Sequence, residues 1–243
     1  MLVIVPVAAQ PTEVLARALG TTAFEAAQLC KRGDYHLLRI AAEGEAEAEA
    51  ERLTAAGLAV VRVPEAEVLA SRPRLVLGGT MDRERLHLRT EGGDIEIAGG
   101  EIMLVVQGPI ARHYQTSAVV KRVRTATLEE GYRFHLHAKG TPRPLEIDPG
   151  GFEFGGSNDA RSSLLAIRDW IATLARLAPL DDFFRRLTPA LGPAVGKPAG
   201  RLGAVASLAP ARGRSREGPL VLDNLLQFRF YSCWRAAVER RRR

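Results

Sequence analysis

The sequence predicts an α+β protein of two units, a small β-α-α-β-α-β domain followed by an antiparallel β-rich domain. The chain has 243 residues, more than the roughly 100–150 residues common for one domain. Apolar residues recur at helical spacing in the first part and at strand spacing after residue 74. The predicted boundaries are 1–68 for the α+β domain, 74–187 for the β-rich domain, 188–218 for a flexible Pro/Gly/Ala/Arg-rich linker and 219–243 for an amphipathic basic helix.

The first domain alternates between strand and helix patterns. Thr22 can cap a helix, with Glu25 three residues later in the capping-box position. Gly20, Gly33 and Gly57 follow apolar periodic stretches and are expected to end helices. The expected elements are strands at residues 2–7, 35–41 and 58–63 and helices at residues 11–19, 22–32 and 43–56.

Three stretches of this domain, at residues 13–20, 24–29 and 47–61, resemble the C-terminal domain of the bacterial ribosomal stalk protein. That family shows a short helix ending in Gly, a second helix containing Glu-Ala and a third, EAE-type helix ending in Ala-Gly. The resemblance implies the fold of the domain. The family recruits translational GTPases through lysines on its paired helices, where this chain offers Arg17, Lys31 and Arg32.

Residues 64–73 are expected to connect the two domains, and short strands with a period of two follow. Pairs such as Gly78–Gly79 and the triplet Glu129–Gly131 are expected to form turns. A long amphipathic helix, capped by Ser157 or Asn158, runs to about residue 177. The expected strands are at residues 75–77, 85–90, 94–97, 102–107, 112–127, 132–138 and 144–147.

About seven strands followed by one amphipathic helix resemble the pleckstrin-homology-like barrel. The hairpin at residues 86–97 and the apolar strand at residues 102–108 look like bacterial members of that superfamily. The resemblance implies a barrel with a C-terminal capping helix, and a generic sheet with a packed helix stays open as the alternative. The order of the two domains also resembles uncharacterised bacterial two-domain proteins, which implies domain order and no activity.

The same resemblance implies a candidate anion-binding site at Arg74, Arg83 and Arg85. In lipid-binding pleckstrin-homology domains, a basic residue on the first strand and a basic-x-basic triplet on the second clasp inositol phosphates. Arginine suits phosphate because its planar fork donates two parallel hydrogen bonds. Asp82 and Glu84 are interleaved with these arginines, so solvated strand-edge charges are the alternative.

The positive charge of the chain is concentrated at its end. Residues 1–70 carry a net charge of −4, residues 71–185 of +1 and residues 186–243 of +9. A basic segment can bind nucleic acid or an anionic membrane by neutralising phosphate. The candidate contacts are Arg212, Arg214, Arg216, Arg240, Arg241, Arg242 and Arg243.

The predicted last helix, at residues 224–240, is rich in apolar and aromatic residues. Such a segment is expected to dock on the same chain or on a partner protein. The sequence leaves these two possibilities open. The candidate docking residues are Leu226, Phe228, Phe230, Tyr231 and Trp234.

Residues that could carry chemistry do not form a recognisable motif. His135 and His137 alternate on a predicted strand and face the same side, as two ligands of one metal would, but a third ligand is missing. The nucleotide-binding patterns GxxxxGK[ST] and GxGxxG and the hydrolase pattern GxSxG do not occur. The sequence therefore predicts no catalytic residues, no metal and no cofactor.

The sequence predicts a cytoplasmic location. Residues 1–6 lack the basic start of a signal peptide, and no apolar stretch approaches the roughly 20 residues that cross a bilayer. Cys30 and Cys233 lie far apart, as expected in a reducing compartment.

The predicted function is that of a non-catalytic binding or adaptor protein, which acts on another protein through its β-rich domain and C-terminal helix. The alternative is a binder of nucleic acid or anionic membrane through the basic tail. An enzyme is the third hypothesis, and a buried pocket with convergent titratable residues would revive it.

Overall fold

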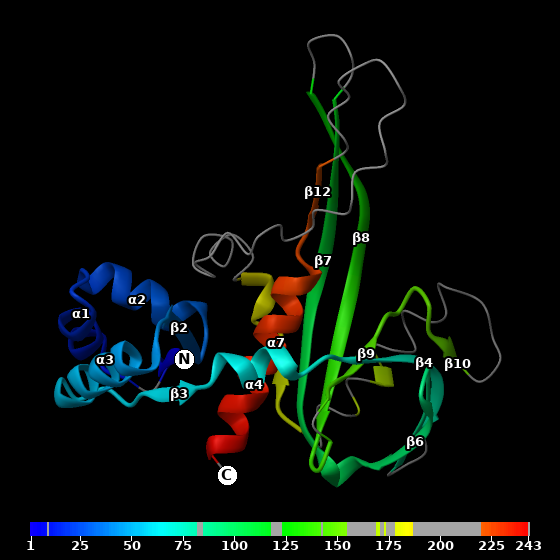
Figure 1. Cartoon of the computed structure of the whole chain (residues 1–243), viewed down its shortest axis with the longest axis horizontal. Coiled ribbons are helices and arrows are strands. Elements are labelled where there is room, and N and C mark those ends of the chain that lie inside the picture. The colour runs from blue at the N-terminus through cyan, green and yellow to red at the C-terminus, as the bar shows by residue number, and fades with distance from the viewer. Residues whose placement is uncertain are drawn as a thin grey trace. The chain divides into compact units, whose positions relative to one another are not determined.

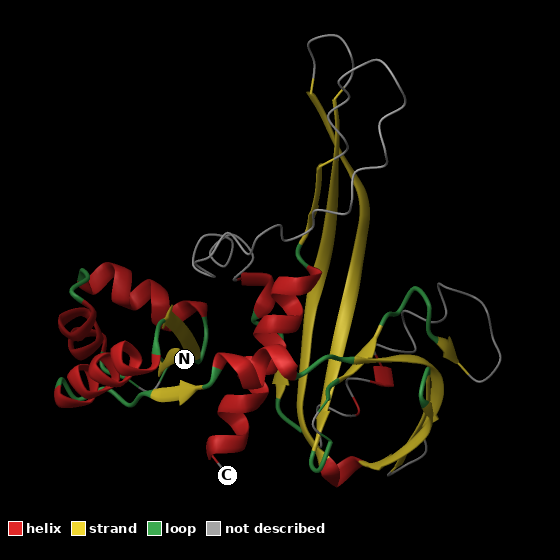
Figure 2. Ribbon diagram, in the orientation of Figure 1, coloured by secondary structure: helices red, strands yellow, loops and turns green. Residues whose placement is uncertain are grey.

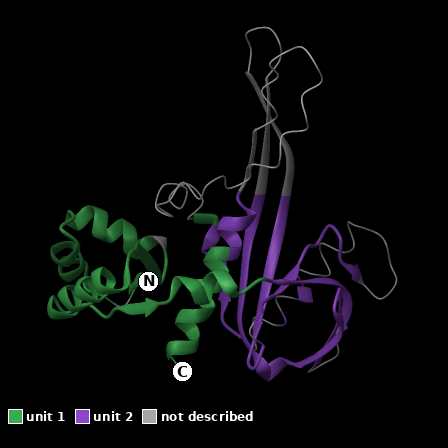
Figure 3. Ribbon diagram, in the orientation of Figure 1, with its two compact units in different colours: residues 1–72, 185–196, 230–243 green, residues 73–184, 197–229 purple. Residues whose placement is uncertain are grey.

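The chain folds into two compact units of mixed α+β structure, which confirms the predicted class (Figure 3). Unit 1 contains residues 1–72, 185–196 and 230–243, and unit 2 contains residues 73–184 and 197–229. No described helix is long and apolar enough to span a membrane. The computed structural model describes residues 1–8, 10–81, 85–117, 123–141, 143–154, 169–170, 173, 178–186 and 220–242.

Unit 1 opens with a three-stranded antiparallel sheet and three helices (Figures 1 and 2). The strand order is β2-β1-β3, so the first strand lies in the centre. Its elements are β1 (Leu2–Pro6), α1 (Thr12–Leu19), α2 (Ala23–Arg32), β2 (Tyr35–Ile40), α3 (Glu43–Ala55) and β3 (Val61–Val63).

Local sequence signals set the helix ends of unit 1. Gly20 follows α1 with a φ of 65°, a left-handed conformation that glycine adopts without strain. The predicted capping box forms at the start of α2, where the backbone N–H of Glu25 donates to Oγ1 of Thr22 at 3.2 Å and the backbone N–H of Thr22 donates to Oε2 of Glu25 at 2.8 Å.

The core of unit 1 lies between the sheet and the helices. β1 is buried over four successive residues, as expected for a central strand with both faces covered. The buried cluster consists of Val3, Val5, Val7, Leu15, Ala16, Ala18, Ala26, Ala46, Leu53 and Leu58.

The segment at residues 64–73, predicted as the connection between the domains, contains a short helix, α4 (Glu65–Ala70). Pro64 stands at its N-cap, where a missing backbone N–H costs nothing. Unit 1 also includes residues 230–242 of the last helix, α7 (Leu225–Arg242). Within unit 1, the guanidinium of Arg235 lies 4.2 Å from the centre of the Tyr35 ring.

Unit 2 contains a curved sheet whose strands follow the order β11-β7-β8-β9-β4-β5-β6, with β10 on β4 and β12 on β7 (Figure 1). The 3-10 turn η1 (Gly99–Glu101) joins β6 to β7. The strands are β4 (Arg74–Met81), β5 (Arg85–Thr90), β6 (Gly93–Ala98), β7 (Ile102–Ser117), β8 (Val123–Ala138), β9 (Leu145–Ile147), β10 (Glu153–Phe154), β11 (Leu180–Asp181) and β12 (Leu220–Asp223).

The predicted antiparallel barrel-like sheet is neither closed nor purely antiparallel in the part of the chain that the structure describes. The strand path begins at β11 and ends at β6, and no described strand joins these two. The sheet is mixed, because β9 and β10 pair with β4 in parallel and β11 pairs with β7 in parallel. A parallel neighbour requires a return of the chain that local patterns do not show.

Two predicted turns lie inside strands instead. Gly131, expected in a turn, pairs with Ile110 within the ladder of β7 and β8, the two longest strands of the unit (Figure 1). Gly78 and Gly79 lie within β4. A Cβ atom on Gly78 would stand 2.6 Å from the carbonyl oxygen of Glu153, so glycine here permits the close approach of β10.

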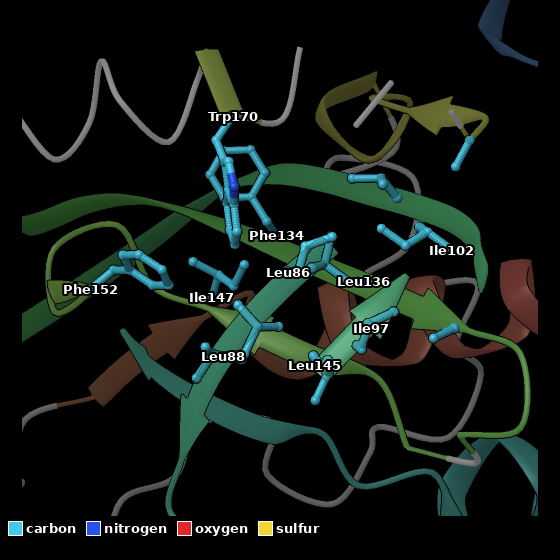
Figure 4. Packing of buried hydrophobic residues seen from close by; sticks show 14 residues of the cluster. Leu86, Leu88, Ile97, Ile102, Phe134, Leu136, Leu145, Ile147, Phe152 and Trp170 are labelled. Atoms are coloured by element: carbon cyan, nitrogen blue, oxygen red, sulfur yellow. The ribbon is translucent and has the colours of Figure 1, made fainter. Parts of the chain in front are cut away.

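The core of unit 2 lies on the concave side of the sheet (Figure 4). Trp170 and Phe152 pack there with their ring centres 5.6 Å apart. Of the predicted capping helix, the structure describes only residues 169, 170 and 173, and the rest lies outside the described residues. The cluster consists of Val76, Leu86, Leu88, Ile97, Ile102, Val105, Phe134, Leu136, Ala138, Leu145, Ile147, Phe152, Trp170 and Ala178.

Candidate binding site on the outer face of β4, β5 and β6

The hairpin of β5 and β6 separates apolar and charged side chains onto two faces. Leu86 and Leu88 are buried in the core, whereas Arg85, His87 and Arg89 between them are exposed. This follows from the period of two in a strand. Across the ladder, His87 is paired with Glu96 and Arg89 with Asp94, so the outer face carries charge on both strands.

A hollow of about 620 Å³ lies over this outer face. Its lining comes from residues 78–80 of β4, residues 87–89 of β5, residues 94–96 of β6 and Glu153 of β10. Gly78 and Gly79 contribute only backbone to this lining, and the carbonyl oxygens of Glu153 and His87 stand where their Cβ atoms would be. The hollow therefore has a backbone floor and a charged rim.

Beside the hollow, β4 contains a β-bulge. Val76 pairs with Thr90 and Gly78 with Arg89, so Leu77 is the extra residue. A bulge bends its strand and increases the local twist. The bend immediately precedes the two glycines against which β10 packs.

Ion pairs organise the rim of the hollow. Arg89 pairs with Glu153, Arg85 pairs with Glu96, and Nδ1 of His87 lies 3.8 Å from Oε2 of Glu96. These side chains are between 48% and 60% exposed. Exposed pairs contribute only about 0–1 kcal/mol to stability, because water screens them. About half of each of these side chains faces solvent.

A second group of charges in unit 2 is buried. His135 on β8 and Glu146 on β9 are directly paired across the ladder. Nε2 of His135 donates to Oε2 of Glu146 at 3.0 Å, and Arg229 of α7 donates to both carboxylate oxygens, at 2.6 and 2.7 Å. Arg133 pairs with Asp148 at 2.6 Å and lies 3.9 Å from Glu146.

The pKa values of this buried cluster follow from its contacts. Burial raises the pKa of Glu146, but the hydrogen bonds from His135 and Arg229 outweigh it and lower the pKa to about 2. Burial also lowers the pKa of His135, against the raising effect of Glu146. These contacts thus favour the ionised form of Glu146, and burial favours the neutral form of His135.

The predicted common face of His135 and His137 exists, but it faces α7. The ring centres of the two histidines are 6.1 Å apart, and the Phe228 ring lies 4.7 Å from that of His135. Among the described residues, no group of three His, Cys, Asp or Glu side chains could hold a metal ion. His135 is held by the Phe228 ring and by Glu146, and His137 is buried beside it.

The structure does not bring the predicted anion-binding arginines together. Arg74 lies at the start of β4, whereas Arg85 lies beside the strand's far end, since Met81 pairs with Leu86. At about 3.3 Å per residue, the two ends of β4 are roughly 23 Å apart. Arg83 lies outside the described residues. Arg74 and Arg85 therefore cannot bind one phosphate.

The predicted docking residues of the last helix are mostly internal. Phe228, Tyr231 and Trp234 are fully buried, and Phe230 is partly buried. Within unit 2, the Phe228 ring packs 5.2 Å from that of Phe184. Only Leu226 is prominently exposed, at 49%. The aromatic residues of α7 therefore belong to the chain's own core.

The described arginines of the tail have partners in unit 1. Arg240 and Arg241 pair with Glu67 at 3.0 and 2.6 Å, and the hydrogen bond from Arg241 lowers the pKa of Glu67. Nη1 of Arg242 donates to the hydroxyl of Tyr35 at 2.6 Å. The other candidates, Arg212, Arg214, Arg216 and Arg243, lie outside the described residues.

The hollow and the buried cluster escaped the sequence prediction, although each has a signal. Two adjacent glycines inside an apolar strand pattern indicate a close backbone approach as well as a turn. A single Glu between Leu145 and Ile147 is the corresponding signal for the buried carboxylate. Neither signal identifies the partner residue.

Comparison of the chain with protein-family models, with curated proteins and with solved structures gives no match. The likeness to the ribosomal stalk domain and to the pleckstrin-homology-like barrel stays a sequence-based prediction. A function therefore has to be argued from the geometry of the described residues.

Proposed function

We propose that the protein is a non-catalytic binding protein, whose β-rich unit holds a partner protein on the outer face of β4, β5 and β6. The observation that carries this proposal is the hollow of about 620 Å³ on that face. Small-molecule pockets commonly have volumes of about 300–1,000 Å³, so a hollow of this size can also receive a few side chains of a partner. The hollow is open and charged, as suits a surface that receives part of another macromolecule.

The ion pairs of the rim support a role in recognition. Glu96 and Glu153 are each held by one arginine of β5, and about half of each carboxylate side chain is exposed. A partner can displace such a pair at small cost, because water already solvates the charges. Charged rims mainly set the specificity of association and its rate.

The contacts of Arg240 and Arg241, two of the described arginines of the tail, support this site over the alternative of a nucleic-acid or membrane binder. Arginines bind nucleic acid or anionic lipid by neutralising phosphate groups. Arg240 and Arg241 share Glu67 as their counterion within unit 1. A phosphate would have to compete with this carboxylate.

Site-specific photo-crosslinking tests the proposal. A benzoylphenylalanine at position 80, an exposed residue that lines the hollow, is expected to capture a discrete protein from native lysate treated with nuclease. The same group at position 51, an exposed site on α3, serves as the matched control. The captured protein is then purified, and its affinity for the full-length chain is measured.

The double variant Glu96→Arg/Glu153→Arg reverses the charge of the rim. We expect it to weaken binding of the purified partner about tenfold or more. Positively charged groups of the partner that meet Glu96 and Glu153 would then face arginine, which repels them. Glu51→Arg should leave the affinity unchanged. Equal binding by the two variants would overturn the proposal. So would capture of nucleic acid from lysate without nuclease, if it disappears on replacing Arg240, Arg241 and Arg242 with Glu.

A further inference from the structure

β6 ends the strand path of the sheet, and its outer edge has no strand partner among the described residues. A strand at such an edge presents backbone N–H and C=O groups to whatever lies beside it. β6 is six residues long and is paired along its whole length with β5. Its inner edge is therefore fixed, and its outer edge can accept another strand.

The register identifies which residues face the open edge. Glu91 and Gly92 form a two-residue turn between the paired residues Thr90 and Gly93. In such a hairpin the pair that flanks the turn is hydrogen-bonded, and hydrogen-bonded pairs recur at every second position. The backbone groups of Asp94, Glu96 and Ala98 therefore point away from β5.

A contact at the end of β6 agrees with this register. The backbone N–H of Ala98 donates to Oε2 of Glu101 at 3.0 Å, so it is directed away from β5 and is already satisfied. The open part of the edge thus consists of Asp94 and Glu96. Each offers one N–H and one carbonyl to an added strand, and both line the hollow.

The charge along this edge defines the occupant. Between Arg89 and Arg112 the sequence contains four acidic residues and no Lys or Arg. Two of the four, Asp94 and Glu96, alternate on β6 and are exposed on its outer face. Alternate residues of an added strand would stand beside them, at the spacing of about 4.7–4.9 Å between neighbouring strands. Lys or Arg at those positions would meet acidic side chains.

We infer that the partner of the β4–β6 face binds as an extended segment with Lys or Arg at alternate positions, added as a strand to the outer edge of β6. This inference rests on the proposed function and names the chemistry of the partner. Main-chain hydrogen bonds to Asp94 and Glu96 give affinity, and the acidic side chains select the basic residues. Rim and edge then act as one site.

Replacing Glu96 by proline separates the backbone contribution from the charge. Proline removes the N–H that faces the open edge and leaves the hydrogen-bonded positions of β6 intact, which is where edge strands tolerate it. Glu96→Ala is the matched control, because it removes the same carboxylate and keeps the N–H. Circular dichroism and thermal unfolding verify that both variants are folded.

The probe is a nine-residue peptide in which Arg alternates with Val, and the control peptide carries Glu in place of Arg. Binding to the full-length protein is followed by fluorescence anisotropy. We expect Glu96→Ala to weaken binding of the Arg peptide about two- to fivefold and Glu96→Pro about tenfold further, since backbone hydrogen bonds are lost as well. Amide exchange at Asp94 and Glu96 should slow when the peptide binds.

Equal affinities of the proline and alanine variants, or unprotected amides at Asp94 and Glu96, would overturn strand addition. Failure of the Arg peptide to bind, or equal binding of the Glu peptide, would overturn the basic occupant. These results are distinct from a failure of the proposed function. If the affinity of the purified partner falls in Glu96→Arg/Glu153→Arg but is equal for Glu96→Pro and Glu96→Ala, the proposed site stands and strand addition is excluded.

Discussion

Glu146 and Glu96 belong to the same sheet and both pair with arginine, but 4% of the Glu146 side chain is exposed against 48% of the Glu96 side chain. Glu146 is fixed from two sides, by His135 and by both guanidinium nitrogens that Arg229 directs at it. Glu96 has one arginine and a distant histidine. The buried group is committed to the fold, and the exposed group can be shared with a partner.

The physical difference is the cost of removing one member of each pair. A buried ion that loses its partner retains the penalty of desolvation, whereas an exposed ion is taken over by water. The same substitution should therefore affect different properties at the two sites. At Glu146 it should affect stability, and at Glu96 it should affect binding.

The largest expected effect is that of Glu146→Gln. The variant keeps the size of the side chain but leaves Arg229, Arg133 and His135 without the carboxylate, and we expect a loss of about 3–5 kcal/mol in the free energy of unfolding. Urea unfolding measures it. Glu153→Gln, an exposed member of the same sheet, is the control and should change stability by less than about 0.5 kcal/mol. Equal losses would contradict the contrast between the sites.

Acid should reveal the same contrast through proton binding. Because folding lowers the pKa of Glu146 from 4.5 to about 2, the unfolded chain binds more protons in this window, and the free energy of unfolding falls as the pH falls through it. The loss amounts to about 3 kcal/mol at 1.36 kcal/mol per pKa unit. The lowered pKa of His135 makes stability fall already below about pH 6.5.

Urea midpoints measured from pH 7 to pH 2 test this dependence. In Glu146→Gln the decline between pH 4.5 and pH 2 should flatten, because the titrating carboxyl is absent. A wild-type stability that rises on acidification from pH 6.5 to pH 5 would contradict the neutral state of buried His135.

The sequence predicts well those features of the fold that depend on residues close together in the chain. The capping box of Thr22 and Glu25 and the alternation of the β5–β6 hairpin depend on residues close in the chain, and both are confirmed. The common face of His135 and His137 follows from the same period of two. Each of these features involves few enough residues for spacing alone to determine it.

The remaining features depend on contacts between distant residues. Arg229 is 83 residues away from Glu146, and no local pattern indicates that they meet. The parallel neighbours of β4 arise in the same way, because β9 and β10 return to it after the long hairpin. For this reason Gly78 and Gly79 were expected in a turn, and the hollow beside them was not predicted.

A substitution at Gly78 tests the packing of β10 against β4, where the backbone forms one side of the hollow. Gly78→Ala places a Cβ 2.6 Å from the carbonyl oxygen of Glu153, a rigid backbone atom. We expect a loss of about 1–3 kcal/mol, typical of overpacking. Gly100→Ala, where the added Cβ meets no atom within 4 Å, is the control. A neutral Gly78→Ala would show that β10 does not pack against β4.

The smallest expected effect on stability is that of Glu96→Ala, and it completes the comparison. Arg85, the main partner of Glu96, is 60% exposed and regains water when the carboxylate is removed. A double-mutant cycle with Arg85→Ala should give a coupling energy of about 0.2–1 kcal/mol, decreasing as salt is added. A coupling above about 2 kcal/mol would place Glu96 with the buried cluster. A small coupling energy together with a clear loss of peptide affinity would instead show that the Glu96 carboxylate contributes to binding and little to stability.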